Sequence, residues 1–273
     1  MKAFAIFLHK VLYPLLKRIF GTLRKHKFIF MNKPPDIPTN AIYAVNHSCK
    51  YDVPYACEAI NRPAYVLVGR QRLKLIDRIF FMINGTVWVD RKDRASRKKS
   101  MSKMLYLLRH NANVLLYPEG TWNLTPSTPV LPLYWGVTDL ARQSDKPIIP
   151  VVLEYYEGEC IVAFGKAVFV SASDSKEEKI RELRDELAAL KWQIWEKMPH
   201  IGYTSALDWQ REAKRRAAEY LKLDIAYENS VIRHEFDTEE TVYKPIAALE
   251  INSKTAFLAK KITEIRNRQQ KQD

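Results

Sequence analysis

Six short apolar runs, most of them separated by longer amphipathic stretches, constrain the fold of this 273-residue chain more than any other feature. Each run has the length and apolar character of a buried strand, and each ends at a polar or turn-forming residue. We predict strands at residues 41–46, 64–69, 85–90, 113–118, 148–156 and 160–165. The last two are close enough to pair through a turn at Glu157 and Gly158.

Helical patterns lie between and after these strands. Beyond Arg94, apolar residues recur at helical spacing: Met101, Met104, Leu105 and Leu108. A capping box at residues 175–178 precedes a second helix, whose apolar face is formed by Ile180, Leu183, Leu187, Leu190 and Ile194. Strands that alternate with helices predict an α/β fold with a mixed, mainly parallel sheet flanked by helices.

These elements define a central domain at residues 31–198. We predict a separate helical, membrane-binding segment at residues 1–30, before the domain. Residues 199–273 are expected to form a helical C-terminal extension, with a helix that begins near Ser205. This extension carries no motif that indicates a role.

The N-terminal segment alternates between apolar and basic side chains. Basic groups recur about every two helical turns and share one stripe of a helix: Lys2, His9, Lys10, Lys17, Arg18, Arg24 and Lys25. A membrane-spanning helix needs about 20 largely uncharged residues, and the uncharged runs here are much shorter. We therefore predict an amphipathic helix that lies in the membrane interface, its basic stripe toward anionic headgroups. The alternative is an ordinary helix packed on the domain, and Pro14 is expected to weaken or kink either one.

Basic residues are concentrated in the first part of the chain, which carries most of the net charge of +13. Up to His110 there are 22 Lys and Arg against 6 Asp and Glu, whereas the remainder has 22 against 25. This excess indicates an anionic partner, which is a nucleic acid, an anionic membrane or a phosphorylated substrate. Nucleic-acid binding would usually add aromatic platforms or a reading helix among the basic groups. The sequence shows neither, so we expect an anionic membrane surface and no nucleic acid.

The three cysteines, Cys49, Cys57 and Cys160, are odd in number and have no paired spacing. This pattern argues against a disulfide framework and for a reducing compartment. Together with the N-terminal helix, it predicts a peripheral (monotopic) membrane protein on the cytoplasmic face.

The segment after the first predicted strand carries the clearest chemical signal. His47 precedes Asp52 by five residues, so one turn can bring the carboxylate to the imidazole. Asp52 would then hold one ring nitrogen and leave the other free as a base. A structural histidine beside an aspartate helix cap explains this pair equally well on its own. Cys49 is poorly placed as a covalent nucleophile, since it lies only two residues from the base.

Polar residues also follow three other predicted strands. Asp90 and Arg91 end one of them, and a guanidinium suits phosphate. A second strand leads into a turn with an acid and a glycine, at residues 118–122. A further apolar strand carries Pro147 and Pro150. Each of these segments alone is compatible with a plain strand end.

Together, the four segments resemble the motifs of the glycerolipid acyltransferase family, which includes the 1-acyl-sn-glycerol-3-phosphate acyltransferases. Their order and separations also agree with the family, over roughly residues 30–195. The matching positions, in motif order, are Asn46, His47 and Asp52; Gly85, Asp90 and Arg91; Pro118, Glu119, Gly120 and Thr121; and Pro150.

The resemblance implies a fold like that of glycerol-3-phosphate acyltransferase and a mechanism without an acyl-enzyme. His47, held by Asp52, would act as general base on the acceptor hydroxyl, which attacks the thioester of acyl-CoA or acyl-carrier protein. The implied acceptor is the lysophospholipid 1-acyl-sn-glycerol-3-phosphate, with Arg91 on its phosphate and with no metal or cofactor. The implied substrate-binding residues are Asn46, Arg91, Glu119, Gly120, Thr121 and Trp122.

One position departs from the family. Trp122 stands where the family usually has arginine, which removes a cation from the expected phosphate site. A related acyltransferase with a different acceptor, such as a lyso-aminolipid, is therefore an alternative. A basic membrane-binding protein without enzymatic activity is a further alternative from a different class.

Overall fold

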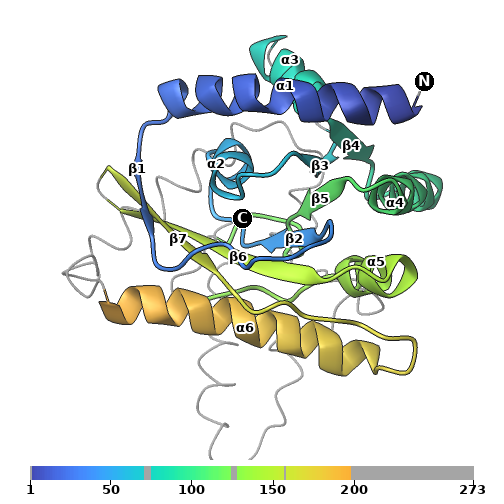
Figure 1. Cartoon of the computed structure of the whole chain (residues 1–273). Coiled ribbons are helices and arrows are strands. Elements are labelled where there is room, and N and C mark those ends of the chain that lie inside the picture. The colour runs from blue at the N-terminus through green and yellow to red at the C-terminus, as the bar shows by residue number, and fades with distance from the viewer. Residues whose placement is uncertain (1, 71–74, 124–127, 157, 198–273) are drawn as a thin grey trace, which may run out of the picture.

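The computed structural model describes residues 2–70, 75–123, 128–156 and 158–197 (Figure 1). Within them, a seven-stranded sheet has the order β1-β7-β6-β2-β5-β3-β4. All neighbouring strands are parallel except β6 and β7, which are antiparallel. The strands are β1 (Lys27–Phe30), β2 (Ile42–Val45), β3 (Ala64–Gly69), β4 (Thr86–Val89), β5 (Asn113–Leu116), β6 (Ile148–Tyr156) and β7 (Glu159–Phe164). The predicted mixed, mainly parallel sheet is confirmed.

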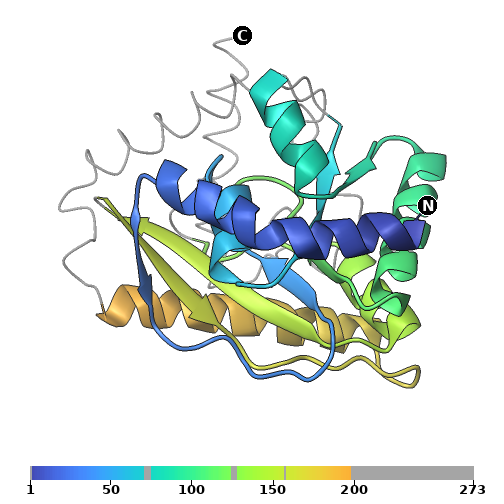
Figure 2. The same cartoon turned by 45° about the horizontal axis from the view of Figure 1, so that its top comes forward.

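Helices cover both faces of this sheet (Figures 1 and 2). Leu16 of α1, helix α2 and Phe81 of α3 pack on one face, in a hydrophobic cluster with Tyr43 and Val45. The last three helices pack on the other face with Ile42 and Ala44, in a cluster that Ile6 of α1 also joins. Because successive strand residues face opposite sides, both faces of each central strand are buried, and its sequence is uniformly apolar. The helices are α1 (Lys2–Leu23), α2 (Asp52–Ala59), α3 (Leu75–Ile83), α4 (Arg94–Arg109), α5 (Gly136–Ser144) and α6 (Lys176–Lys197).

The predicted strands all form, with small changes at their ends, but β1 was not predicted. It lies inside the 1–30 segment that we predicted to be helical, and α1 already ends at Leu23. Strand β1 is a four-residue edge strand defined by parallel pairing with β7, about 130 residues further along the chain. No local pattern can show such a pairing. The expected C-terminal extension, with its helix near Ser205, lies outside the described residues.

Helix α6 begins as its sequence predicts. The hydroxyl of Ser175 accepts a 3.4 Å hydrogen bond from the backbone N–H of Glu178, which is the first half of the expected capping box. The five apolar residues predicted to face inward are all buried in the hydrophobic cluster beneath the sheet. A buried ion pair between Lys191 and Glu154, 3.2 Å apart, also joins the helix to β6.

Helix α1 packs one face on the domain. Its inward side chains are Ile6, His9, Tyr13 and Leu16, and the Tyr13 hydroxyl donates a 2.8 Å hydrogen bond to the carbonyl of Cys57. Pro14 does not interrupt the helix. The prediction that His9 belongs to the basic stripe is wrong, because its ring is buried edge-on against Tyr65.

The opposite face of α1 is apolar and exposed, as the interfacial helix requires. Its exposed residues are Phe4, Phe7, Leu8, Val11, Leu15 and Ile19. Two members of the predicted basic stripe instead face the domain, where Lys17 donates to the Asn61 side chain and Arg24 pairs with Glu58. No helix in the described part of the chain is long and apolar enough to cross a membrane.

Burial of His9 makes the stability of the fold depend on pH. Burial lowers the pKa of His9 from 6.5 to about 4, against a smaller opposing effect of a hydrogen bond with the Asn84 backbone. The unfolded chain therefore binds a proton that the folded chain excludes, and stability falls as pH drops from 6.5 toward 4. Substitution His9→Phe keeps a ring against Tyr65 and removes the titrating group. Between pH 7.5 and pH 5, the wild type should lose about 2 kcal/mol more unfolding free energy than this variant in urea titrations. Equal losses in the two proteins would contradict the buried, neutral state of His9.

Candidate active site at the ends of strands β2 and β5

His47 and Asp52 form a hydrogen-bonded pair where β2 ends and α2 begins. His47 Nδ1 lies 2.7 Å from Asp52 Oδ2, and the His47 side chain is 17% exposed while that of Asp52 is fully buried. Because Nδ1 faces the carboxylate, Nε2 is the ring nitrogen that can accept a proton from a substrate. The predicted pairing of base and carboxylate is therefore present in the fold.

The Asp52 carboxylate is surrounded by hydrogen-bond donors. Besides His47, Oδ2 accepts the backbone N–H groups of Ser48 at 2.6 Å and Cys49 at 2.9 Å. Oδ1 accepts the hydroxyl of Tyr155 at 2.7 Å. Burial opposes ionisation of Asp52 and by itself raises its pKa. The hydrogen bond from His47, the charge of His47 and the backbone N–H groups of Cys49 and Ser48 outweigh this effect and hold the Asp52 pKa below its usual value. Asp52 is therefore a stable anion that can orient the imidazole and stabilise its protonated form.

Sequence reasoning missed Tyr155. This residue lies near the end of β6, 103 positions after Asp52, and no local motif marks it. It reaches the carboxylate because β6 pairs directly with β2 in the sheet. Its ring also packs edge-on against His26, with 5.4 Å between centroids, which links the site to the turn between α1 and β1.

The turn after β5 fixes the backbone of His47. Glu119 Oε1 accepts the His47 N–H at 2.8 Å, while Oε2 accepts the N–H of Leu131 at 2.8 Å. On the other side, the N–H of Asn123 donates to the His47 carbonyl at 2.6 Å. Burial raises the pKa of Glu119 to about 7. The N–H groups of Leu131 and His47 and the charge of Lys191 oppose this rise. The backbone of His47 is thus held through both its N–H and its carbonyl group.

Gly120 occupies a position that no other residue suits. Its φ is +73°, and a Cβ atom there would come within 2.5 Å of the Tyr134 ring. The Gly120 carbonyl accepts a hydrogen bond from Nη1 of Arg91, at the end of β4. The turns that follow β4 and β5 are therefore joined directly beside the His47 site.

Two aromatic rings enclose the His47 imidazole. Tyr117 stacks on it with 4.2 Å between centroids, and Trp122 packs edge-on at 5.9 Å. Trp122 is only 6% exposed. It therefore forms part of the wall around His47, at the position where the family usually carries a cation.

Two residues predicted to bind substrate, Asn46 and Glu119, direct their side chains to backbone groups of the protein. Asn46 is 1% exposed, and its amide bonds both backbone groups of Leu153, which clamps β2 to β6. Both carboxylate oxygens of Glu119 are likewise committed to backbone N–H groups, so Glu119 positions His47. Thr121 is also buried, at 5% exposed, whereas Arg91 is half-buried.

Cys49 does not fit the role of a nucleophile. Burial and then the neighbouring charge of Asp52 raise the pKa of its thiol well above the usual value. A protonated thiol is a poor nucleophile. Within the described residues, no group of three or more His, Cys, Asp or Glu side chains is arranged to hold a metal ion.

Comparisons with known proteins agree with this geometry. Residues 29–154 match the sequence model of the acyltransferase family. The chain is 26% identical over 182 residues to a 1-acyl-sn-glycerol-3-phosphate acyltransferase of Saccharomyces cerevisiae, covering 61% of this chain and 58% of the relative. It is 29% identical over 124 residues to a protein of the same description from Salmonella typhimurium, covering 44% of this chain and 49% of the relative. The matched segment thus spans about half the length of these relatives.

A solved structure shows a similar fold. The crystal structure of the 1-acyl-sn-glycerophosphate acyltransferase PlsC from Thermotoga maritima superposes with a TM-score of 0.52 at 17% sequence identity. The superposition covers 70% of this chain and 81% of that one. The sequence match spans the pair His47 and Asp52, the turn at Gly120 and the whole of strands β2 to β5. Residues 29–154 thus match the acyltransferase family model, and the superposition shows a similar fold.

Proposed function

We propose that this protein transfers a fatty acyl group from a thioester donor to the free hydroxyl of 1-acyl-sn-glycerol-3-phosphate, which yields phosphatidic acid. The 2.7 Å contact between His47 Nδ1 and the buried Asp52 carboxylate carries this proposal. The descriptions of the curated relatives, which name this acceptor, support the choice of substrate.

The proposed reaction uses His47 as a proton carrier. Nε2 accepts the proton of the acceptor hydroxyl while the hydroxyl oxygen attacks the thioester carbonyl carbon. The carbon–sulfur bond of the tetrahedral intermediate then breaks, and the protonated imidazole supplies the proton to the leaving thiolate. Asp52 stabilises the imidazolium between these two steps. General-base assistance of this kind is worth about 10²–10⁴-fold in rate.

Arg91 is the proposed ligand of the acceptor phosphate. Its guanidinium lies at the turn that also holds Glu119 and, through it, His47. A guanidinium presents five N–H donors in a planar fork, which matches phosphate oxygens. Exposed basic residues follow it in the sequence and would attract an anionic substrate: Lys92, Arg94, Lys98 and Lys99.

The donor is proposed to be acyl-CoA or acyl-carrier protein, and the site of action the cytoplasmic face of a membrane. The exposed apolar face of α1 supports peripheral binding to that surface, because apolar side chains would leave water there. The replacement of the family's arginine by Trp122 keeps a second acceptor class, such as a lyso-aminolipid, as the competing candidate.

The catalytic pair can be tested with a graded series of substitutions. His47→Ala should reduce acyl transfer by at least about a hundredfold, because it removes the proposed base. Asp52→Asn should be severely impaired as well, since an amide can present the wrong partner to Nδ1. Tyr155→Phe removes one donor from Asp52 and should lower kcat by a smaller factor with KM nearly unchanged.

The measurement is thioester consumption by purified protein, with lysophosphatidic acid as acceptor and both types of donor. Tyr156→Phe, a change at the neighbouring residue, serves as the control for loss of a tyrosine hydroxyl on β6. Substantial activity in the His47→Ala protein would remove His47 from the mechanism.

The acceptor can be tested by comparing Arg91→Ala and Trp122→Arg. A charge-assisted hydrogen bond contributes about 1.5–3 kcal/mol, so Arg91→Ala should cost at least about tenfold in kcat/KM for lysophosphatidic acid. A lysolipid with an uncharged headgroup should be affected less. Equal losses on both acceptors would assign Arg91 a purely structural role through the Gly120 carbonyl. New activity on lysophosphatidic acid in Trp122→Arg, absent from the wild type, would show that the natural acceptor is different.

Membrane binding can be tested on the exposed face of α1 without disturbing its buried face. The triple substitution Phe7→Gln, Val11→Gln and Leu15→Gln changes only side chains that are more than half exposed. Burying one such side chain in lipid contributes about 1.5–3 kcal/mol, so the variant should lose at least about a hundredfold in partitioning to anionic vesicles. Binding of the wild type should also weaken as salt rises, because exposed charges are screened. Unchanged cosedimentation of the variant would place the membrane contact elsewhere.

A further inference from the structure

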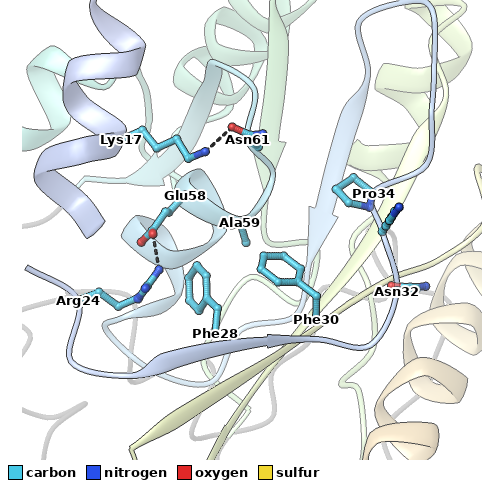
Figure 3. Close-up of a pocket in the computed structure, with 10 residues that line it drawn as sticks. Lys17, Arg24, Phe28, Phe30, Asn32, Pro34, Glu58, Ala59 and Asn61 are labelled. Carbon is cyan, nitrogen blue, oxygen red and sulfur yellow. Dashed lines mark hydrogen bonds and ion pairs between the residues drawn. The ribbon is translucent and has the colours of Figure 1, made fainter. Parts of the chain in front are cut away.

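A cavity of about 580 Å³ lies between α1, β1 and α2, apart from the His47 site (Figure 3). Its volume falls within the range typical of small-molecule sites. Glu58 on its wall follows Asp52 by six residues of α2, which corresponds to about 9 Å along the helix axis. Neither His47, Asp52 nor Glu119 contributes to its lining.

The cavity has an excess of positive charge. Three cations line it, Lys17, Arg24 and Lys33, against the single carboxylate of Glu58. Arg24 pairs with Glu58, and Lys17 donates a 2.5 Å hydrogen bond to the neutral side chain of Asn61. Among the described residues, no carboxylate lies within ion-pair distance of Lys17 or Lys33. The charge of Lys17 also acts on Glu58. With three cations and one carboxylate, the lining still has an excess of positive charge that can attract an anion.

The opposite wall of the cavity is apolar. Phe28 and Phe30 project from β1 toward α2, with 5.8 Å between their ring centroids (Figure 3). Phe30 is 47% exposed although it is large and apolar. The Arg24 guanidinium lies over the Phe28 ring at 4.4 Å, which places a cation at the boundary of the apolar wall. A ligand that fits both walls has an anionic group joined to an apolar portion.

The position of the cavity favours a lipid. Lys17 belongs to α1, the helix whose outer face exposes six large apolar side chains. A protein that lies on a bilayer through this face would bring the cavity close to the headgroup region. Lysine and arginine are the side chains that bind lipid phosphate in such a location.

We propose that this cavity binds the phosphate of an anionic membrane phospholipid, with the glycerol and first acyl carbons against Phe28 and Phe30. Lys17, Arg24 and Lys33 hold the phosphate oxygens, and Glu58 fixes the orientation of Arg24. The site is separate from the acceptor site and independent of the chemistry of His47.

Phosphatidylglycerol is a suitable probe, because it is neither acceptor nor product of the proposed reaction. The full chain is titrated calorimetrically with dihexanoyl phosphatidylglycerol below its critical micelle concentration. Dihexanoyl phosphatidylcholine and inorganic phosphate are titrated in parallel. The double variant Lys17→Gln, Lys33→Gln removes two cavity cations. Its matched control, Lys10→Gln with Arg18→Gln, removes two exposed cations of α1 outside the cavity.

Phosphatidylglycerol is expected to bind saturably and more tightly than phosphatidylcholine, whose quaternary ammonium the cavity would repel. The Lys17, Lys33 variant should weaken this binding at least about tenfold, and the control variant by less than about twofold. Phe30→Ala should weaken binding of the lipid but leave that of inorganic phosphate unchanged.

Absence of saturable binding in the wild type would overturn the proposal, and so would any of three further results. The first is wild-type binding in the Lys17, Lys33 variant. The second is an equal loss in both double variants, which would indicate general attraction to a basic surface. The third is inorganic phosphate that binds as tightly as the lipid and with the same dependence on Lys17 and Lys33. That result would retain a phosphate site but assign it to a soluble ligand.

Discussion

The buried carboxylate of Asp52 is the group on which the rest of the site depends. An isolated charge in a protein interior is very costly, so its position requires several hydrogen-bond donors at once. Those donors come from three places, which are the His47 ring, the backbone N–H groups of Ser48 and Cys49, and the Tyr155 hydroxyl. The end of β2, the start of α2 and the end of β6 must therefore keep a fixed relative position for the fold to tolerate this charge.

The turns beyond the other strands extend this arrangement. Glu119 and Asn123 hold the two backbone groups of His47, and Arg91 bonds the Gly120 carbonyl. Strands β2, β5, β3 and β4 are neighbours in this order and run parallel. The turns that follow β2, β5 and β4 therefore all lie at the carboxyl-terminal ends of the parallel strands. A network that uses backbone groups on several strands positions His47 more rigidly than one side-chain contact could.

Helix α1 has the structural features of both predictions that the sequence left as alternatives. One face packs on the domain and the opposite face remains apolar and exposed. The turn that follows α1 also touches the site, because His26 packs against Tyr155, which bonds Asp52. The turn after α1 is thus connected to the buried Asp52 carboxylate through two side chains.

The sequence by itself determined the α/β class, six of the seven strands and the pairing of His47 with Asp52. These features are encoded locally: a buried parallel strand is a continuous apolar run, and a five-residue separation can bring a carboxylate to an imidazole within one turn. Strand β1, Tyr155 and the inward orientation of His9 were decided only by the tertiary structure. Each depends on a contact with a residue distant in the chain, namely β7, Asp52 and Tyr65. The same applies to Asn46 and Glu119: sequence placed them in the site, but only the packing of β6 and the turn after β5 shows that their polar atoms bind backbone groups.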